Sequence, residues 1–118
     1  MNSEEVLTKT TEELLEAIGK DITKGRSVVP LSKKALVDIG RSWFQQNYLK
    51  ISNHVCNNER IRKLYKDKNI RRRTMLIVAL GDLLMGIISG VSPITVSALL
   101  MKEGLETVCR NQWADILD

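Results

Sequence analysis

The chain has 118 residues and a formal net charge of +4; 43% of its residues are hydrophobic and only 4% are aromatic. This length fits one domain over residues 1–118 that buries its own core, and the aliphatic composition favours helix packing over sheet. The sequence has one histidine and lacks a glycine-rich phosphate loop, a nucleophile elbow and paired metal ligands. We therefore expect no enzyme, no metal site and no bound cofactor.

A capping box predicts the first long helix. Thr10 is followed three residues later by Glu13, so that each side chain can bond the backbone amide of the other. Gly25 can close this helix, and the acidic residues of its first turn suit the positive end of the helix dipole. The apolar residues that recur at helical spacing are Leu14, Leu15, Ile18 and Ile22.

A longer helix is predicted from Ser32 to about Cys56. Ser32 follows a short extended linker that contains Pro30, and its side chain can cap the helix. We expect Trp43 and Phe44 to anchor the core; the alternative is an exposed aromatic surface for a partner helix or for base stacking. The apolar residues of this helix are Ala35, Leu36, Ile39, Trp43, Phe44, Tyr48, Ile51 and Val55.

The two cysteines, Cys56 and Cys109, are expected to be reduced. No secretory signal is visible at the N-terminus, and free thiols are typical of a cytosol-like compartment, so we expect a cytoplasmic protein. His54 lies two residues before Cys56, but two such ligands without a second pair do not make a metal site.

Charge is distributed unevenly along the chain. Residues 1–25 contain six acidic side chains against three lysines, whereas residues 58–73 contain eight basic side chains against two acidic ones. A short helix is predicted after Asn57 and Asn58, with an apolar stripe formed by Ile61, Leu64 and Tyr65. The basic side chains of this region are Arg60, Arg62, Lys63, Lys66, Lys68, Arg71, Arg72 and Arg73.

Three interpretations of this basic region stay open. It can be a solvated helix face with ion pairs to the acidic N-terminal helix. It can bind the phosphates of nucleic acid, because clustered lysine and arginine release counterions from the backbone. The same charges can also face anionic lipid headgroups.

Residues 75–101 form the most apolar segment, and Asp82 is its single charge. A helix that is hydrophobic on all sides is typical of the centre of a bundle or of a membrane span. Ser92 and Pro93 predict that one helix ends and another begins there, because serine caps helices and proline suits the first helical position. We expect a buried helical hairpin in which Asp82 has a buried partner. The glycines expected to allow close helix packing are Gly81, Gly86 and Gly90.

A membrane span is an alternative for the same segment. Residues 75–93 are long and apolar enough to cross a bilayer, and the arginines before them would lie at the cytoplasmic side. Asp82 argues against this interpretation, because a carboxylate costs about 2.5–3.5 kcal/mol in the middle of a membrane helix.

Residues 82–101 also resemble a helix-turn-helix motif, with Gly90 as the turn glycine and Val91 at the apolar turn position. The resemblance implies that the second helix enters the major groove of DNA, with Val96 and Leu99 facing inward. The residues that would face the bases are Ser92, Pro93, Ile94, Ser97, Ala98 and Met101. None is Arg, Lys, Asn or Gln, the side chains that pair bidentately with base edges.

A last helix is predicted to run to the C-terminus, with Trp113 packed on the core or on a second protomer. Its apolar residues are Leu105, Val108, Cys109, Trp113, Ile116 and Leu117. Together these features predict an all-α bundle of five or six helices around the apolar hairpin of residues 75–101.

The function expected from the sequence is that of a small non-enzymatic, homo-oligomeric accessory or regulatory protein. Its basic residues named above, together with Lys102, would contact mostly the phosphate backbone of DNA or RNA. A protein that inserts residues 75–101 into a membrane is the first alternative. A protein–protein adaptor, whose basic surface meets an acidic partner, is the second.

Overall fold

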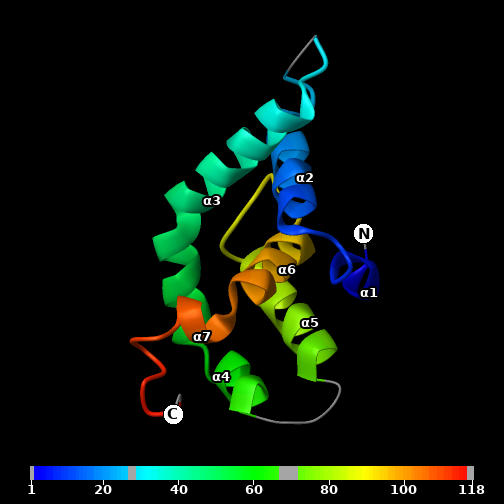
Figure 1. Ribbon diagram of the computed structural model, residues 1–118. Coiled ribbons are helices and arrows are strands. Elements are labelled where there is room, and N and C mark those ends of the chain that lie inside the picture. The colour runs from blue at the N-terminus through cyan, green and yellow to red at the C-terminus, as the bar shows by residue number, and fades with distance from the viewer. Residues whose placement is uncertain (1, 27–28, 67–71, 117–118) are drawn as a thin grey trace.

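The computed structural model describes residues 2–26, 29–66 and 72–116 (Figure 1). Within these ranges the regular secondary structure is helical, which confirms the predicted all-α bundle. Five helices have eight or more residues, and two are single turns. The helices are α1 (Ser3–Val6), α2 (Thr11–Thr23), α3 (Lys33–Cys56), α4 (Glu59–Lys66), α5 (Arg72–Met85), α6 (Pro93–Glu103) and α7 (Leu105–Val108).

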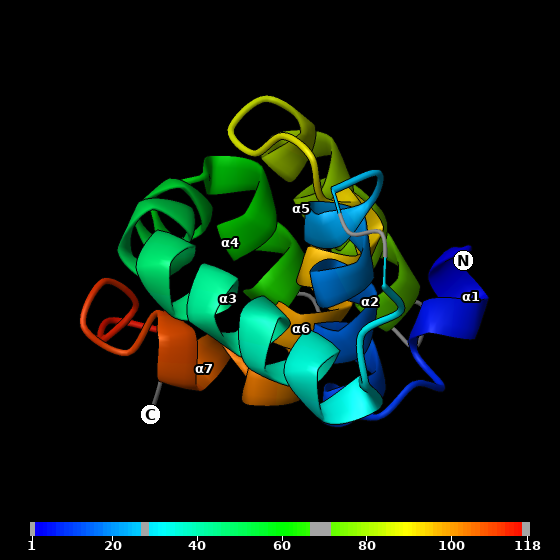
Figure 2. The same cartoon turned by 90° about the horizontal axis from the view of Figure 1, so that it is seen from above.

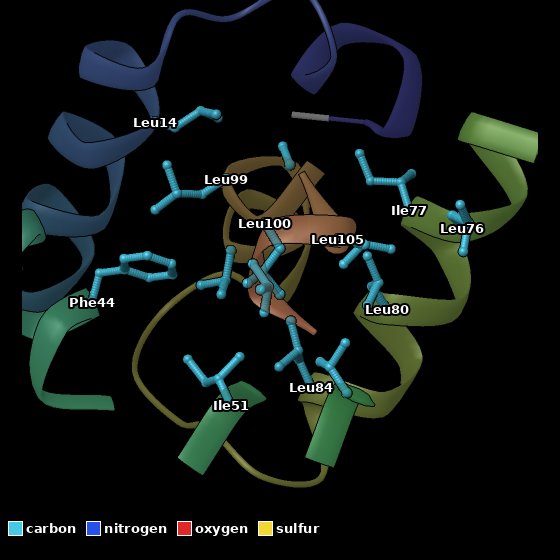
Figure 3. Packing of buried hydrophobic residues seen from close by; sticks show 14 of the residues in the cluster. Leu14, Phe44, Ile51, Leu76, Ile77, Leu80, Leu84, Leu99, Leu100 and Leu105 are labelled. Carbon is cyan, nitrogen blue, oxygen red and sulfur yellow. The ribbon is translucent and has the colours of Figure 1, made fainter. Parts of the chain in front are cut away.

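Helix α6 lies at the centre of the bundle. All side chains from Thr95 to Leu100 are buried, so no face of this stretch meets solvent. Figure 3 shows Leu99 on the side of α2 and α3, near Phe44, and Ile77 of α5 on the opposite side. The predicted apolar hairpin is therefore confirmed: α5 packs against α6, and the core continues on both sides of α6.

Helices α2 and α3 lie side by side and pack backbone against backbone (Figures 1 and 2). A Cβ atom on Gly19 would come within 2.1 Å of the carbonyl oxygen of Leu36. A Cβ atom on Gly40 would come within 1.9 Å of the carbonyl oxygen of Leu15. Since neither distance is sterically possible, each helix needs glycine where the other crosses it.

The glycines of the apolar segment have other roles. A Cβ atom on Gly81 or Gly86 would meet its nearest neighbour at 3.7 Å, an ordinary contact. Gly90 has a φ of +78°, a left-handed conformation that turns the chain between α5 and α6. The prediction that Gly81, Gly86 and Gly90 allow close helix packing is therefore wrong, because an added Cβ on Gly90 would meet no atom within 4 Å, but Gly90 is confirmed as the turn glycine.

Local side-chain caps start α2, α3 and α4, as the sequence predicts, and Asn2 caps α1 in the same way. Thr10 Oγ1 accepts from the amide of Glu13 at 3.1 Å, and Glu13 Oε1 accepts from the amide of Thr10 at 3.0 Å. Ser32 Oγ accepts from the amide of Ala35 at 3.1 Å. Asn58 Oδ1 accepts from the amide of Ile61 in the first turn of α4. Each cap satisfies an amide that the helix itself leaves unbonded.

The start of α6 differs from the prediction in one detail. Pro93 is at its first position, as expected, but the Ser92 hydroxyl makes no capping bond. Instead the Ser92 amide donates to Asp21 Oδ2 of α2 at 2.9 Å. A carboxylate here also suits the positive end of the α6 dipole. The acidic α2 thus supplies a structural contact to the central helix.

Helix α6 does not have the geometry of a DNA-reading helix. Residues 86–92 separate it from α5, whereas the turn of a helix-turn-helix motif has about three or four residues. Val91, Val96 and Leu99 are buried, as the resemblance implied. However, Ser97 and Ala98, which would face the bases, are equally buried. The interpretation of α6 as a recognition helix is therefore wrong, because the core covers its outward face.

Helix α5, by contrast, has an outer face in contact with solvent. Met75, Val78 and Met85 are 45%, 43% and 70% exposed. Asp82 lies on the same face, and its side chain is 61% exposed. The expectation of a buried Asp82 with a buried partner is therefore wrong: the carboxylate points outward at the one stripe of α5 that the bundle does not cover.

The apolar window of residues 75–93 is not one helix, because α5 ends at Met85 and a turn follows. Among the described residues, no helix combines the length and the apolar character that crossing a bilayer requires.

A disulfide bond joins Cys56 at the end of α3 to Cys109 directly after α7. The fold brings the two Cα atoms to 5.4 Å, within the usual range for a disulfide. The expectation of reduced thiols is therefore wrong, and the support that it gave to a cytoplasmic location is lost.

The C-terminal segment is also less helical than predicted, since α7 ends at Val108 and turns follow. Trp113 is fully buried within its own chain, and its indole Nε1 donates to the carbonyl oxygen of Cys56 at 2.9 Å. Its ring packs against the ring of Tyr65, with the two ring centroids 4.9 Å apart. These contacts hold the segment without a continuous helix. Leu117 lies outside the described residues.

Candidate nucleic-acid interface

Helix α4 separates its apolar and basic side chains sharply. Ile61 is buried and Leu64 and Tyr65 are partly buried, and these three side chains face the bundle. At 100° per residue, Lys63 and Lys66 then lie at the centre of the opposite face, and both are exposed. The predicted apolar stripe is confirmed, and the outward face of α4 carries the two lysines together with the exposed Glu59.

Two arginines flank this outward face, and each pairs with an acidic side chain. Arg60 Nη1 lies 3.9 Å from Asp82 Oδ2 of α5, and the two side chains are 66% and 61% exposed. Arg62 Nη2 donates to Asp115 Oδ2 of the C-terminal segment. Exposed pairs of this kind contribute only about 0–1 kcal/mol, so a phosphate can compete for the arginines.

A further exposed cation lies at the start of α5. Arg73 is exposed and lines a small cavity of about 170 Å³ together with Tyr65 near the end of α4. The start of α5 lies near the end of α4, and Asp82, later in α5, lies near Arg60 at the start of α4. Helices α4 and α5 are therefore antiparallel. We call Lys63, Lys66 and Arg73 the basic face. Within the described residues, none of its three members forms an ion pair.

An acidic side chain borders the basic face. Glu106 of α7 lines the same cavity as Arg73, and its Oε2 accepts from the Tyr65 hydroxyl at 2.9 Å. Lys102 is exposed in the last turn of α6, next to Met101, which also lines the cavity. The structure thus brings this end of α6 to the junction of α4 and α5.

The remaining basic residues predicted for the interface cannot be placed. Lys68 and Arg71 lie outside the described residues, and so does the side chain of Arg72, although its backbone belongs to α5.

The acidic α2 lies away from the basic face. In Figure 1, α2 is in the upper half of the molecule and α4 is at the lower end. The described ion pairs do not join the two: Lys20 pairs with Glu16 inside α2, and the arginines of α4 pair with Asp82 and Asp115. Among the described residues, no ion pair supports the alternative in which the acidic N-terminal helix neutralises the basic region.

This arrangement presents exposed cations on two packed helices, α4 and α5. Lysine and arginine so placed contact phosphates, which fixes the position of a nucleic acid without reading its sequence. The described residues contain no group of three His, Cys, Asp or Glu side chains that could hold a metal ion.

A cleft that the sequence did not indicate lies between α2, α3 and α6, with a volume of about 530 Å³. Its residues come from three distant parts of the chain, so no local pattern could reveal it. No family model, curated protein or solved structure matched the chain.

Proposed function

We propose that the protein is a small non-enzymatic accessory or regulatory protein that binds the phosphate backbone of DNA or RNA. Its contacts are made by the basic face, with Arg60 and Arg62 beside it. The observation that supports this proposal is the separation of charge: Lys63, Lys66 and Arg73 are exposed and lack ion pairs within the described residues, and the acidic α2 lies elsewhere.

Binding of this kind is independent of sequence. Phosphate contacts supply affinity through counterion release, whereas sequence is read by side chains that reach the base edges. The helix that could have read the bases, α6, is buried. Specificity, where it exists, then comes from the shape of the nucleic acid or from a partner protein.

The proposal is tested with two triple variants of equal charge. The first, Lys63→Ala/Lys66→Ala/Arg73→Ala, removes the basic face. The second, Lys24→Ala/Lys34→Ala/Lys50→Ala, removes three exposed lysines from α3 and the end of α2. Fluorescence anisotropy with a random-sequence duplex and with a single-stranded RNA measures both.

We expect the first variant to bind about tenfold more weakly or worse, because each lost phosphate contact removes a counterion-release contribution. The second should stay within about twofold of the wild type, since its lysines lie off the proposed interface. Equal losses of binding affinity in the two variants, or no binding of nucleic acid by the wild type, would contradict the proposal.

Self-association stays a prediction of the sequence. Trp113, which was one candidate for an intermolecular contact, is buried in its own chain. The exposed apolar stripe of α5, formed by Met75, Val78 and Met85, is the surface on which an oligomer or a protein partner would depend.

A further inference from the structure

The cleft between α2, α3 and α6 has an apolar floor and a polar rim. Its floor is formed by Leu15, Phe44 and Leu99, one from each helix, and all three are buried. Its volume of about 530 Å³ is within the range of about 300–1,000 Å³ that small-molecule sites have. The rim residues are Thr11, Arg41, Gln45, Tyr48 and Glu103.

Most polar side chains of the rim are available to a ligand. Thr11, Gln45, Tyr48 and Glu103 form no side-chain hydrogen bond or ion pair with another described residue. Together they offer two hydroxyls, an amide and a carboxylate around one apolar floor. Such convergent polar groups on an apolar surface are what orients a small ligand.

The carboxylate of Glu103 gives the cleft a group that can attract a cation. Arg41 also lines the cleft, and its guanidinium forms an exposed ion pair with Asp38, whose Oδ1 lies 3.6 Å from Arg41 Nη1. Glu103 has no such counter-ion among the described residues, and it is the last residue of α6. The carbonyl groups that end a helix carry a partial negative charge, which adds to the attraction.

Two aromatic rings reinforce this preference. Phe44 and Tyr48 are packed edge to face, with centroids 5.6 Å apart and planes at 78°. Both line the cleft, and Tyr48 is only partly buried. The face of an aromatic ring attracts an ammonium group through its quadrupole.

We propose that this cleft binds a small organic cation, an ammonium group carried on an apolar body. The apolar body lies on Leu15, Phe44 and Leu99, and the ammonium group meets the carboxylate of Glu103 and the ring of Tyr48. This site is separate from the basic face and does not depend on the proposed nucleic-acid binding.

Three probes of the same size test the ligand class: phenethylammonium, 2-phenylethanol and phenylacetate. They share the phenyl ring and differ in charge. Amide chemical shifts from NMR, followed during titration, report both the site and the affinity. We expect phenethylammonium to bind about tenfold more tightly than the other two, with the largest shifts in residues 41–48 and 99–103. Equal binding of the three probes, or shifts elsewhere, would overturn the proposal.

Two variants test the residues. Glu103→Gln keeps the shape of an exposed side chain and should weaken the cation about fivefold while leaving 2-phenylethanol unchanged. Tyr48→Phe keeps the ring and should retain binding, whereas Tyr48→Leu should lose it. The control is Glu59→Gln, which removes an exposed carboxylate from α4. A Glu103→Gln variant that weakens both probes equally, or no more than the control, would refute the role of Glu103.

Discussion

Among the glycines of the described structure, Gly40 is the one at which an added methyl group should lower the stability of the fold most. Its added Cβ would lie 1.9 Å from the carbonyl oxygen of Leu15, and a backbone atom cannot move aside as a flexible side chain can. We therefore expect Gly40→Ala to force α2 and α3 apart and to cost about 1–3 kcal/mol or more of unfolding free energy. Urea denaturation measures the loss.

The matched control is Gly81→Ala in α5. Its Cβ would meet Ser97 Oγ at 3.7 Å, so no neighbour has to move. Because alanine is the better helix former by about 1 kcal/mol, this variant should be neutral or more stable than the wild type. Similar losses in the two variants would show that the contact between α2 and α3 is not as close as described.

The capping box of α2 gives the protein a component of stability that depends on pH. Hydrogen bonds from the Thr10 amide and side chain lower the pKa of Glu13 below its ordinary value of 4.5. A carboxylate whose folded pKa is lowered stabilises the fold above the unfolded pKa and loses that effect as the pH falls through the folded pKa.

Replacing this carboxylate should therefore matter only when it is charged. We expect Glu13→Gln to be less stable than the wild type near neutral pH, and the difference to shrink as the pH falls below 4.5. Thermal unfolding at several pH values measures it. A difference that stays constant with pH would show that the charge of Glu13 makes no contribution.

These residues also show which contacts sequence patterns reveal. The caps by Thr10, Ser32 and Asn58 were predictable because both partners lie within three residues. The roles of Gly19 and Gly40 were not, since each depends on a helix that only the tertiary fold brings near.

At the scale of elements, the C-terminal segment after α7 depends on one covalent bond and a few contacts. The Cys56–Cys109 disulfide closes a loop with a sequence separation of 53. A loop of this size stabilises a fold by about 4 kcal/mol in the chain-entropy model. The Trp113 indole, which donates a hydrogen bond to the carbonyl oxygen of Cys56, then fixes the segment on the end of α3.

We expect Cys56→Ala/Cys109→Ala to lose about 2–5 kcal/mol of stability and to expose Trp113. Trp113 is followed by fluorescence in a Trp43→Phe background, in which it is the single tryptophan. Dithiothreitol should reproduce the loss in the parent protein and have no effect in the double variant. Full retention of stability after reduction would contradict this account of the segment.

Element boundaries followed the sequence where strong local signals exist. The long α3 begins after Ser32 and ends at Cys56, as the cap and the apolar spacing indicated. The last helix was extended too far, because the helical spacing of Cys109 and Trp113 also occurs in the consecutive turns that follow α7. The disulfide was missed because reduced thiols were inferred from the lack of a visible secretory signal, and cysteines far apart in the chain carry no distance information that could correct this inference.

At the scale of the whole molecule, the acidic and basic segments of the sequence become separate surfaces. The basic face was predictable in part, since Lys63, Lys66 and Arg73 lie in one run of cations. The pairing of Arg60 with Asp82 was not, because Asp82 was expected inside the core. The cleft between α2, α3 and α6 left no local signal.

The salt dependence of nucleic-acid binding tests the central claim most directly. The slope of log K against log salt concentration is measured for the wild type and for the two triple variants. Each contacted phosphate contributes about 0.9 to this slope on duplex DNA, so loss of the basic face should flatten it by up to about 2.7. The Lys24/Lys34/Lys50 variant should keep the wild-type slope. An unchanged slope after loss of Lys63, Lys66 and Arg73 would contradict binding through this surface.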